Sequence, residues 1–156
     1  GSSPACPTKI KGKEMKEELD NKLVKAFPLL YKDRNAPMQS TAMCWGFPGD
    51  GWFDLIWDLS SKLEPLIQKF IDENQDTELY PKAAQVKEKY GGLRFYMTSG
   101  SDEIYDLIDE AEALSYKTCE VCGKPGEERL GGWVHTLCDY CHENWDKIRA
   151  KIWEKE

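Results

Sequence analysis

Four cysteines near the C-terminus, arranged as two Cys-x-x-Cys pairs, constrain the fold of this chain more than any other feature. Cys119 and Cys122 form the first pair, Cys138 and Cys141 form the second, and 15 residues separate the two pairs. Two thiolates at this spacing can bind one tetrahedral ion if the backbone turns tightly between them, and the spacer length is typical of zinc sites. Gly123 directly follows the first pair and can supply that turn. The pattern therefore predicts a zinc ion bound by four cysteines.

A site of four thiolates leaves no coordination position for water, because the tetrahedral ion is then fully coordinated. Such a site stabilises the fold and does not activate a substrate, so we expect a structural metal. Two disulfides are the alternative, and no other feature of the sequence indicates the oxidising compartment that they require. Cys44, beside Trp45, is expected to be a buried thiol.

The cysteine-rich segment resembles a treble-clef zinc finger, with a Cys pair, a short hairpin through residues 131–134, and a second pair that leads into a helix over residues 139–156. The run from His135 to His142 also resembles the C-terminal part of HNH-type nucleases. Those nucleases insert a catalytic ββα element with a second metal site between the pairs, and 15 residues are too few for it. We therefore interpret His135 and His142 as groups on the surface or beside the metal ligands, because a hydrolytic site needs more ligands than these.

Hydrophobic periodicity predicts helices over residues 15–27 and 52–74, and from the caps at 99–102 to about Lys117. Residues 28–51 are rich in proline and glycine and are expected to be irregular, with Asp50 as the cap of the following helix. Pro65 predicts either one bent helix or two in series. The acidic face of the third helix is interpreted as a solvated surface, with a binding face as the alternative.

Residues 82–98 predict a β-hairpin, because apolar residues alternate with polar ones after Gly91 and Gly92. A short helix that starts at Pro81 is the alternative for the first half. The predicted fold class is α+β, with helices packed around this small hairpin and a four-cysteine treble-clef zinc finger at the C-terminus. We expect three segments, which are a tag or linker remnant (1–14), an α+β domain (15–117) and the zinc finger with its helix (118–156). A native flexible arm is the alternative for the first segment.

Charge and hydropathy exclude several classes of function. The 156 residues include 21 Lys and Arg against 28 Asp and Glu, which gives a net charge of −7. An acidic chain lacks the cations for coating duplex DNA, so we expect no general duplex binding. No apolar run approaches the ~18 residues of a membrane span, and the N-terminus lacks a secretory signal. We therefore expect a cytoplasmic protein with no membrane partner.

The hairpin prediction places Lys87, Lys89, Arg94 and Tyr96 on one face, which would suit a small anionic ligand such as a nucleotide. The better supported alternative is that these cations pair with carboxylates on neighbouring helices. Trp52 joins this candidate site only if it is exposed beside Arg94. Otherwise it is expected in the core, as are the other aromatic residues of its region, Trp45, Phe47 and Trp57.

Sequence signatures of the common hydrolases, metalloproteases and nucleotide-binding proteins are absent. Residues 50–54 also lack the spacing of a calcium loop. We therefore expect no enzymatic activity.

Three further segments, GDGW (49–52), QVKEKYGGLRFY (85–96) and CEVCGKPG (119–126), together resemble small uncharacterised proteins of bacteriophages and prophages. The resemblance covers nearly all of residues 15–141. It implies no established activity, but it implies a setting, the cytoplasm of an infected bacterium. Small acidic proteins in that setting often bind and block a host or defence component.

The sequence thus favours a non-catalytic binding protein. It either inhibits a host or defence protein through an exposed acidic or aromatic surface, or sequesters a small anionic ligand in a pocket lined by Lys87, Arg94 and Tyr96. The alternative from another class is a nucleic-acid-processing enzyme related to the HNH nucleases, or a nucleic-acid-binding module.

Overall fold

The structure is a computed structural model that describes residues 15–154, with side chains as far as residue 151. The predicted tag or linker remnant, residues 1–14, lies outside the described residues. The described part is α+β, as predicted, with five α-helices, a hairpin in the body and a shorter hairpin near the C-terminus. Short 3-10 helices occupy the segment that was predicted to be irregular, η1 (Lys32–Asn35), η2 (Ala42–Trp45) and η3 (Asp50–Trp52).

Three α-helices build the body, α1 (Glu17–Ala26), α2 (Phe53–Asn74) and α3 (Asp102–Ser115). Each buries most of the apolar stripe from which it was predicted, although Trp57 of α2 and Leu114 of α3 are exposed. The side chain of Ser101 caps α3 by accepting the backbone N–H of Ile104 at 3.3 Å. The helices, the hairpin and the loops around the 3-10 helices share one hydrophobic core, whose largest fully buried side chains are Trp52, Tyr31, Leu23, Leu30, Met43, Ile56, Leu63, Ile67 and Leu93.

α2 is one helix of 22 residues, so of the two alternatives for Pro65 the single helix is observed. Pro65 offers no N–H to the carbonyl of Ser61, but both residues are exposed, and water can replace that hydrogen bond. The prediction that Asp50 caps α2 is wrong. Its carboxylate instead accepts the backbone N–H of Lys16 at 2.8 Å and so binds the start of α1.

The central hairpin consists of β1 (Ala83–Lys89) and β2 (Gly92–Met97), which pair antiparallel as predicted. Tyr90 and Gly91 form the turn with φ angles of 55° and 80°, and a two-residue type I′ turn requires positive φ at both positions. The predicted alternation of apolar and polar side chains is also confirmed. The face of the hairpin that packs on the core contains the residues predicted for it, with Val86, Leu93 and Phe95 buried and Met97 partly buried.

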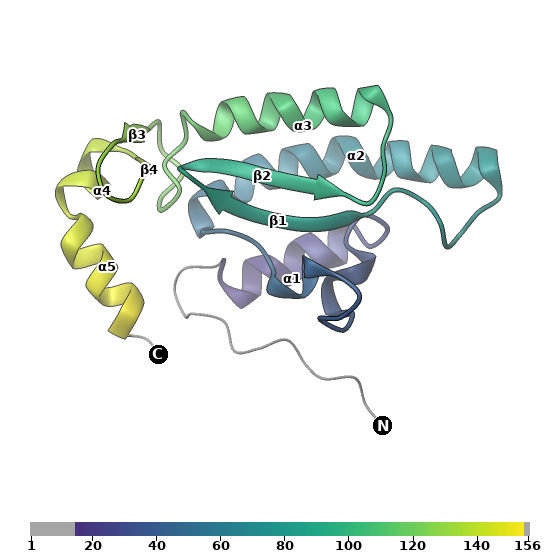
Figure 1. Ribbon diagram of the computed structural model, residues 1–156, viewed down its shortest axis with the longest axis horizontal. Helices are drawn as coiled ribbons and strands as arrows, with labels where there is room; N and C mark the ends of the chain where they lie inside the picture. The colour runs from purple at the N-terminus through teal and green to yellow at the C-terminus, as the bar shows by residue number, and fades with distance from the viewer. Residues whose placement is uncertain (1–14, 155–156) are drawn as a thin grey trace.

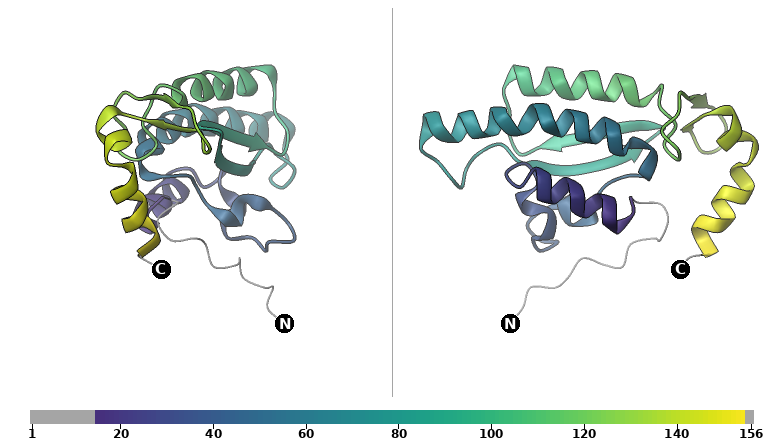
Figure 2. Two further views of the ribbon diagram at one scale, coloured as in Figure 1. Left: turned by 60° about the vertical axis from the view of Figure 1, so that its left-hand side comes forward. Right: turned by 180° about the vertical axis from the view of Figure 1, so that it is seen from behind.

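Figures 1 and 2 show how the helices surround this hairpin. α1 and α2 lie on one side of it, and α3 runs along β2. The Leu93 N–H of β2 points out of the sheet and donates to the Ser115 hydroxyl of α3 at 2.9 Å. The turn of the hairpin points toward the cysteine-rich end of the molecule, so the body presents this turn to the C-terminal module.

The C-terminal module contains β3 (Glu127–Arg129), β4 (His135–Leu137), α4 (Asp139–Glu143) and α5 (Trp145–Glu154). The two strands form the predicted short hairpin. The prediction of one helix over residues 139–156 is wrong, because the helix breaks at Asn144. At this break the side-chain amide and the backbone N–H of Asn144 both donate to the Tyr140 carbonyl, at 2.8 and 3.0 Å. None of the described helices has both the length and the apolar content needed to cross a bilayer.

Candidate metal centre

The first cysteine pair lies in a tight turn. The Gly123 N–H donates to the Cys119 carbonyl at 2.9 Å, and the Cys119 N–H donates to the Lys124 carbonyl at 2.8 Å. Gly123 adopts φ +82°, a conformation that residues with a side chain rarely adopt. The predicted role of this glycine is therefore confirmed, and the turn brings the thiols of Cys119 and Cys122 to the same side.

The second pair lies at the start of α4. Cys138 is the N-cap of this helix, and its Sγ accepts the backbone N–H of Cys141 at 3.4 Å. The preceding strand, β4, buries Leu137 beneath the thiols. The turn before the hairpin and the start of the helix after it therefore supply two sulfurs each, in the order predicted for a treble clef.

The four thiols fit one tetrahedral ion. Their Sγ atoms all lie within 4.8 Å of one another, and the Sγ atoms of Cys122 and Cys138 are 3.6 Å apart. Four ligands at the Zn–S bond length of ~2.3 Å would stand about 3.8 Å apart. Neither pair forms a disulfide, since all four cysteines are free. The cluster could therefore hold a metal ion, as the sequence predicted for these residues.

The surroundings favour the thiolate form at one ligand in particular. Burial raises the pKa of Cys122 and of Cys141. Burial acts in the same direction at Cys138, but hydrogen bonds from the Cys141 N–H and from neighbouring thiols outweigh it and lower the pKa of Cys138 to about 7. Because metals bind the thiolate, this lowered pKa favours the form of Cys138 that a metal ion would bind.

Hydrogen bonds from the GDGW segment attach the cysteine cluster to the body. The Gly51 N–H donates to the Glu120 carbonyl at 3.1 Å, and the Trp52 indole N–H donates to the Thr118 carbonyl at 2.9 Å. A Cβ at Gly51 would overlap the carbonyl oxygen of Cys119, so only glycine allows this close approach. This contact was not predicted from the sequence, although the two glycines of GDGW were its signal.

The turn of the body hairpin makes a second attachment. The Thr136 hydroxyl donates to the Gly91 carbonyl at 2.6 Å, and the Glu120 N–H donates to the Thr136 carbonyl at 3.0 Å. Thr136 is fully buried by these contacts. The GDGW segment, the turn of the body hairpin and the first cysteine pair therefore meet at one joint between body and module.

The two histidines differ in environment. His142 is exposed, as predicted for a surface group. His135 is only 7% exposed, its Nδ1 lies 2.7 Å from Glu120 Oε1, and its ring packs against Trp133 and Trp145 at centroid distances of 5.2 and 4.5 Å. His135 is thus a buried packing group beside the cysteine ligands, oriented by a glutamate that the sequence analysis did not single out.

The predicted ligand face of the hairpin forms only in part. Lys87 lies opposite Arg94 across the strands, and Lys87 Nζ lies 5.8 Å from the centre of the Tyr96 ring. Arg94 forms an ion pair with Glu112 of α3 at 2.5 Å, which is the pairing expected from the alternative. Lys89 contacts the Tyr90 ring at the turn.

Trp52 does not belong to this face. It is fully buried and bonds the cysteine module, so its assignment as a ligand-binding residue is wrong. Phe47 is buried as expected, whereas Trp45 and Trp57 are 40% and 38% exposed. Cys44 is buried as predicted but is disulfide-bonded, so the prediction of a thiol is wrong.

Comparisons with models of protein families, with curated proteins and with solved structures find no match for this chain.

Proposed function

We propose that this chain is a non-catalytic binding protein that contacts another protein through an acidic face of α3, and that its four cysteines hold a structural zinc ion. The observation that carries the proposal is a row of exposed carboxylates on α3. Among the described residues none of them forms an ion pair. This acidic face consists of Asp102, Glu103, Asp106, Asp109 and Glu110.

Zinc is the proposed metal because a tetrahedral set of four thiolates suits it. When bound, zinc would link Cys119, Cys122, Cys138 and Cys141 and would have no position left for water or substrate. The residues beside the ligands serve packing, as the buried contacts of His135 and Thr136 illustrate. We therefore place the activity away from the metal centre.

The size of the acidic face favours a macromolecular partner. A helix of 14 residues is about 21 Å long, which exceeds the span of most small ligands. Exposed charges of one sign accelerate association with a partner of opposite charge, and salt weakens this effect. The expected partner is therefore a protein with a basic surface.

The resemblance to bacteriophage proteins favours a host or defence protein in the bacterial cytoplasm as the partner. The version in which the chain sequesters a small anion has less support, because Arg94 is already paired with Glu112. The nuclease-like alternative has less support as well, because His135 is buried and bonded to Glu120.

Cross-linking mass spectrometry of gently purified protein tests the proposal. The test variant carries Asp106→Lys, Asp109→Lys and Glu110→Lys, and the control carries Glu18→Lys, Glu128→Lys and Glu143→Lys, which reverse exposed charges elsewhere. We expect wild type and control to cross-link through α3 to one basic protein, and we expect the test variant and 500 mM salt to abolish this. Cross-links that persist in the test variant would contradict the proposal.

A further inference from the structure

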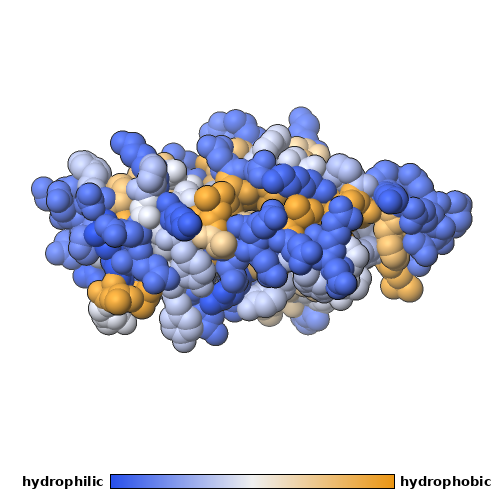
Figure 3. All heavy atoms as spheres, turned by 90° about the horizontal axis from the view of Figure 1, so that it is seen from above, coloured by the Kyte–Doolittle hydropathy of each residue, from blue (hydrophilic) through white to orange (hydrophobic). Residues whose placement is uncertain are grey.

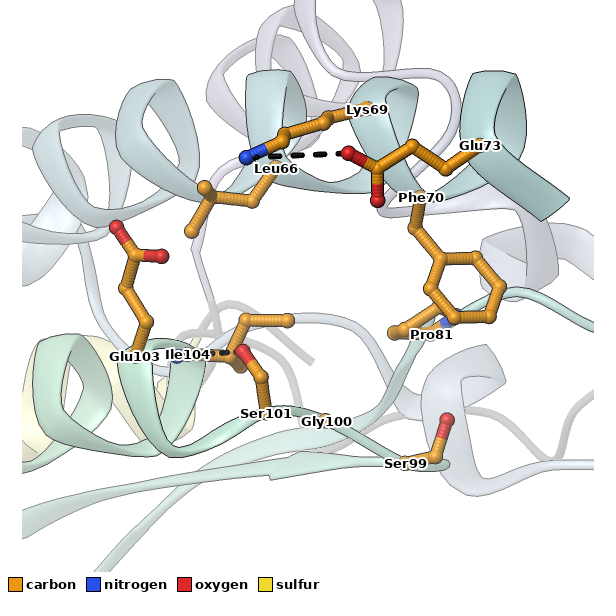
Figure 4. A pocket seen from close by; sticks show the side chains of 10 residues that line it. All are labelled: Leu66, Lys69, Phe70, Glu73, Pro81, Ser99, Gly100, Ser101, Glu103 and Ile104. Carbon is orange, nitrogen blue, oxygen red and sulfur yellow. Dashed lines mark hydrogen bonds and ion pairs between the residues drawn. The ribbon is translucent and has the colours of Figure 1, made fainter.

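A pocket opens between α2 and the start of α3, and Glu103 of the acidic face is one of its lining residues. Its volume is about 450 Å³. Figure 4 shows side chains from both helices and from the preceding loop around an open space. Its apolar lining comes from Leu66 and Phe70 of α2, from Pro81, and from Ile104 of α3.

The lining is apolar at the base and charged at the edge. Pro81 and Ile104 are buried, and Leu66 and Phe70 are half-buried against the core. Glu103 borders the pocket from α3, while Lys69 and Glu73 border it from α2 as an ion pair at 3.9 Å. Figure 3 looks down on α3 and shows apolar patches among hydrophilic side chains on this side of the molecule.

The chain segments beside the pocket carry a strong negative charge. Residues 66–82 and 99–106 together contain seven carboxylates and two lysines, and one of these, Lys69, is paired with Glu73. An apolar side chain that enters the pocket brings the residues beside it in the partner's sequence close to these carboxylates, where the negative potential favours positive charge. Lys or Arg is therefore expected at those neighbouring positions.

We propose that this pocket receives one apolar side chain of the protein partner, flanked in the partner's sequence by Lys or Arg. This inference rests on the proposed function and specifies how the acidic face selects a partner. The apolar side chain supplies buried area, while the flanking cations pair with Glu103 and its neighbours on α3.

Other occupants fit less well. A small anion would meet the carboxylates of Glu73 and Glu103, and Lys69, the one cation among the lining residues, is already paired. A second copy of this chain would bring a net charge of −7 against the acidic face. Charge complementarity therefore favours a basic segment of a different protein.

Synthetic peptides test the inference on the zinc-loaded full chain. The probe is a fluorescein-labelled peptide of 13 residues with one central Phe between Lys-Arg pairs. Matched peptides replace the Phe by Ser or the basic residues by Glu. We expect the probe to bind, and each replacement to weaken binding by roughly tenfold or more, as expected for loss of a buried aromatic side chain or of complementary charge. Backbone amide shifts at Gly100 and Ser101, which line the pocket, should accompany binding.

Variants locate the site. Ser99→Trp adds bulk to an exposed lining residue without removing any core side chain, and Glu103→Lys reverses the charge at the edge. Both should weaken probe binding, whereas Glu143→Lys on α4 makes the same charge change and should not. Thermal unfolding curves check that each variant is folded.

The outcomes separate this inference from the proposed function. If the Ser-containing peptide binds as well as the probe and α3 amides shift, the acidic face recognises basic segments, but the pocket inference is wrong. If no peptide binds, the pocket inference is also wrong, and the cross-linking experiment still decides the proposed function. Loss of binding with Ser99→Trp and with the Ser-containing peptide together would support the pocket.

Discussion

The body and the cysteine module are stabilised in different ways. The body has 21 buried core residues drawn from α1, α2, α3, the hairpin and the intervening loops. Among the described residues the module has four, of which three are cysteines and only Leu137 is an ordinary apolar residue. Hydrophobic burial can stabilise the body without any ligand, whereas a core of this size cannot stabilise the module. The module therefore depends on the proposed metal and on its attachment to the body.

Metal removal should have the largest effect and should separate the two regions. Structural zinc contributes on the order of 10 kcal/mol to small modules of this kind, because metal binding supplies their folding energy. We expect a strong chelator, or Cys138→Ser, to expose the backbone amides of residues 118–151 to hydrogen exchange while those of α2 stay protected. Metal analysis should give one zinc ion per chain before chelation.

Re-addition of zinc provides the control for this prediction, since it should restore protection in the chelated wild type but not in Cys138→Ser. Equal loss of protection in α2 and in the module would contradict the view that the body is stable without the metal, because body and module would then form one cooperative unit that depends on it.

A cavity in the body should have the next largest effect. Leu63 is fully buried in α2, and its replacement by alanine should lower the free energy of unfolding by about 2–5 kcal/mol. Chemical denaturation followed by circular dichroism measures this change. Leu114→Ala is the matched control, because Leu114 is 52% exposed on α3 and should change stability by less than about 1 kcal/mol. Zinc content should stay the same in both variants, and zinc loss in Leu63→Ala would show that the body supports the metal site.

Much of each region was predictable from the sequence because its signals are local. The cysteine spacing, the glycine that turns the first pair, and the alternation of the hairpin depend on residues a few positions apart. The joint was not predictable, because it unites residues such as Trp52 and Thr118 that are 66 positions apart. For the same reason the sequence left Trp52 with two interpretations, the core and the ligand site, since its local context fits a surface aromatic as well as a buried one. The break at Asn144 was not predicted, because apolar residues keep a helical spacing on both sides of it.

Gly51→Ala should damage this joint and have an intermediate effect. The new methyl group would overlap the backbone of Cys119, which cannot move without disturbing the metal ligand. Overpacking of this kind costs about 1–3 kcal/mol. We expect faster hydrogen exchange at residues 118–126 and a lower midpoint of thermal unfolding.

The matched control for this change is Gly132→Ala in the loop between β3 and β4, where an added Cβ would meet no atom within 4 Å. Its unfolding midpoint should stay near that of wild type. An unaltered midpoint in Gly51→Ala would show that the module can shift on the body at little cost, and the joint would then not be a specific contact.

The smallest expected effect concerns the ion pair between Arg94 and Glu112, which joins the hairpin to α3 within the body. Their side chains are 25% and 37% exposed, and pairs at this exposure contribute about 0–1 kcal/mol because water screens them. A double-mutant cycle with Arg94→Ala and Glu112→Ala should therefore give a small coupling energy that shrinks in 500 mM salt.

Native mass spectrometry tests whether Arg94 also binds a ligand. If the cycle gives a small coupling energy and Arg94→Ala loses a small molecule that is found on wild type, Arg94 binds that ligand. In that event the hairpin face, and not α3, would be the recognition surface. If wild type carries no small molecule, the pair is a structural contact that tolerates substitution. The body would then tolerate changes on its surface, whereas the module would depend on each of its cysteines.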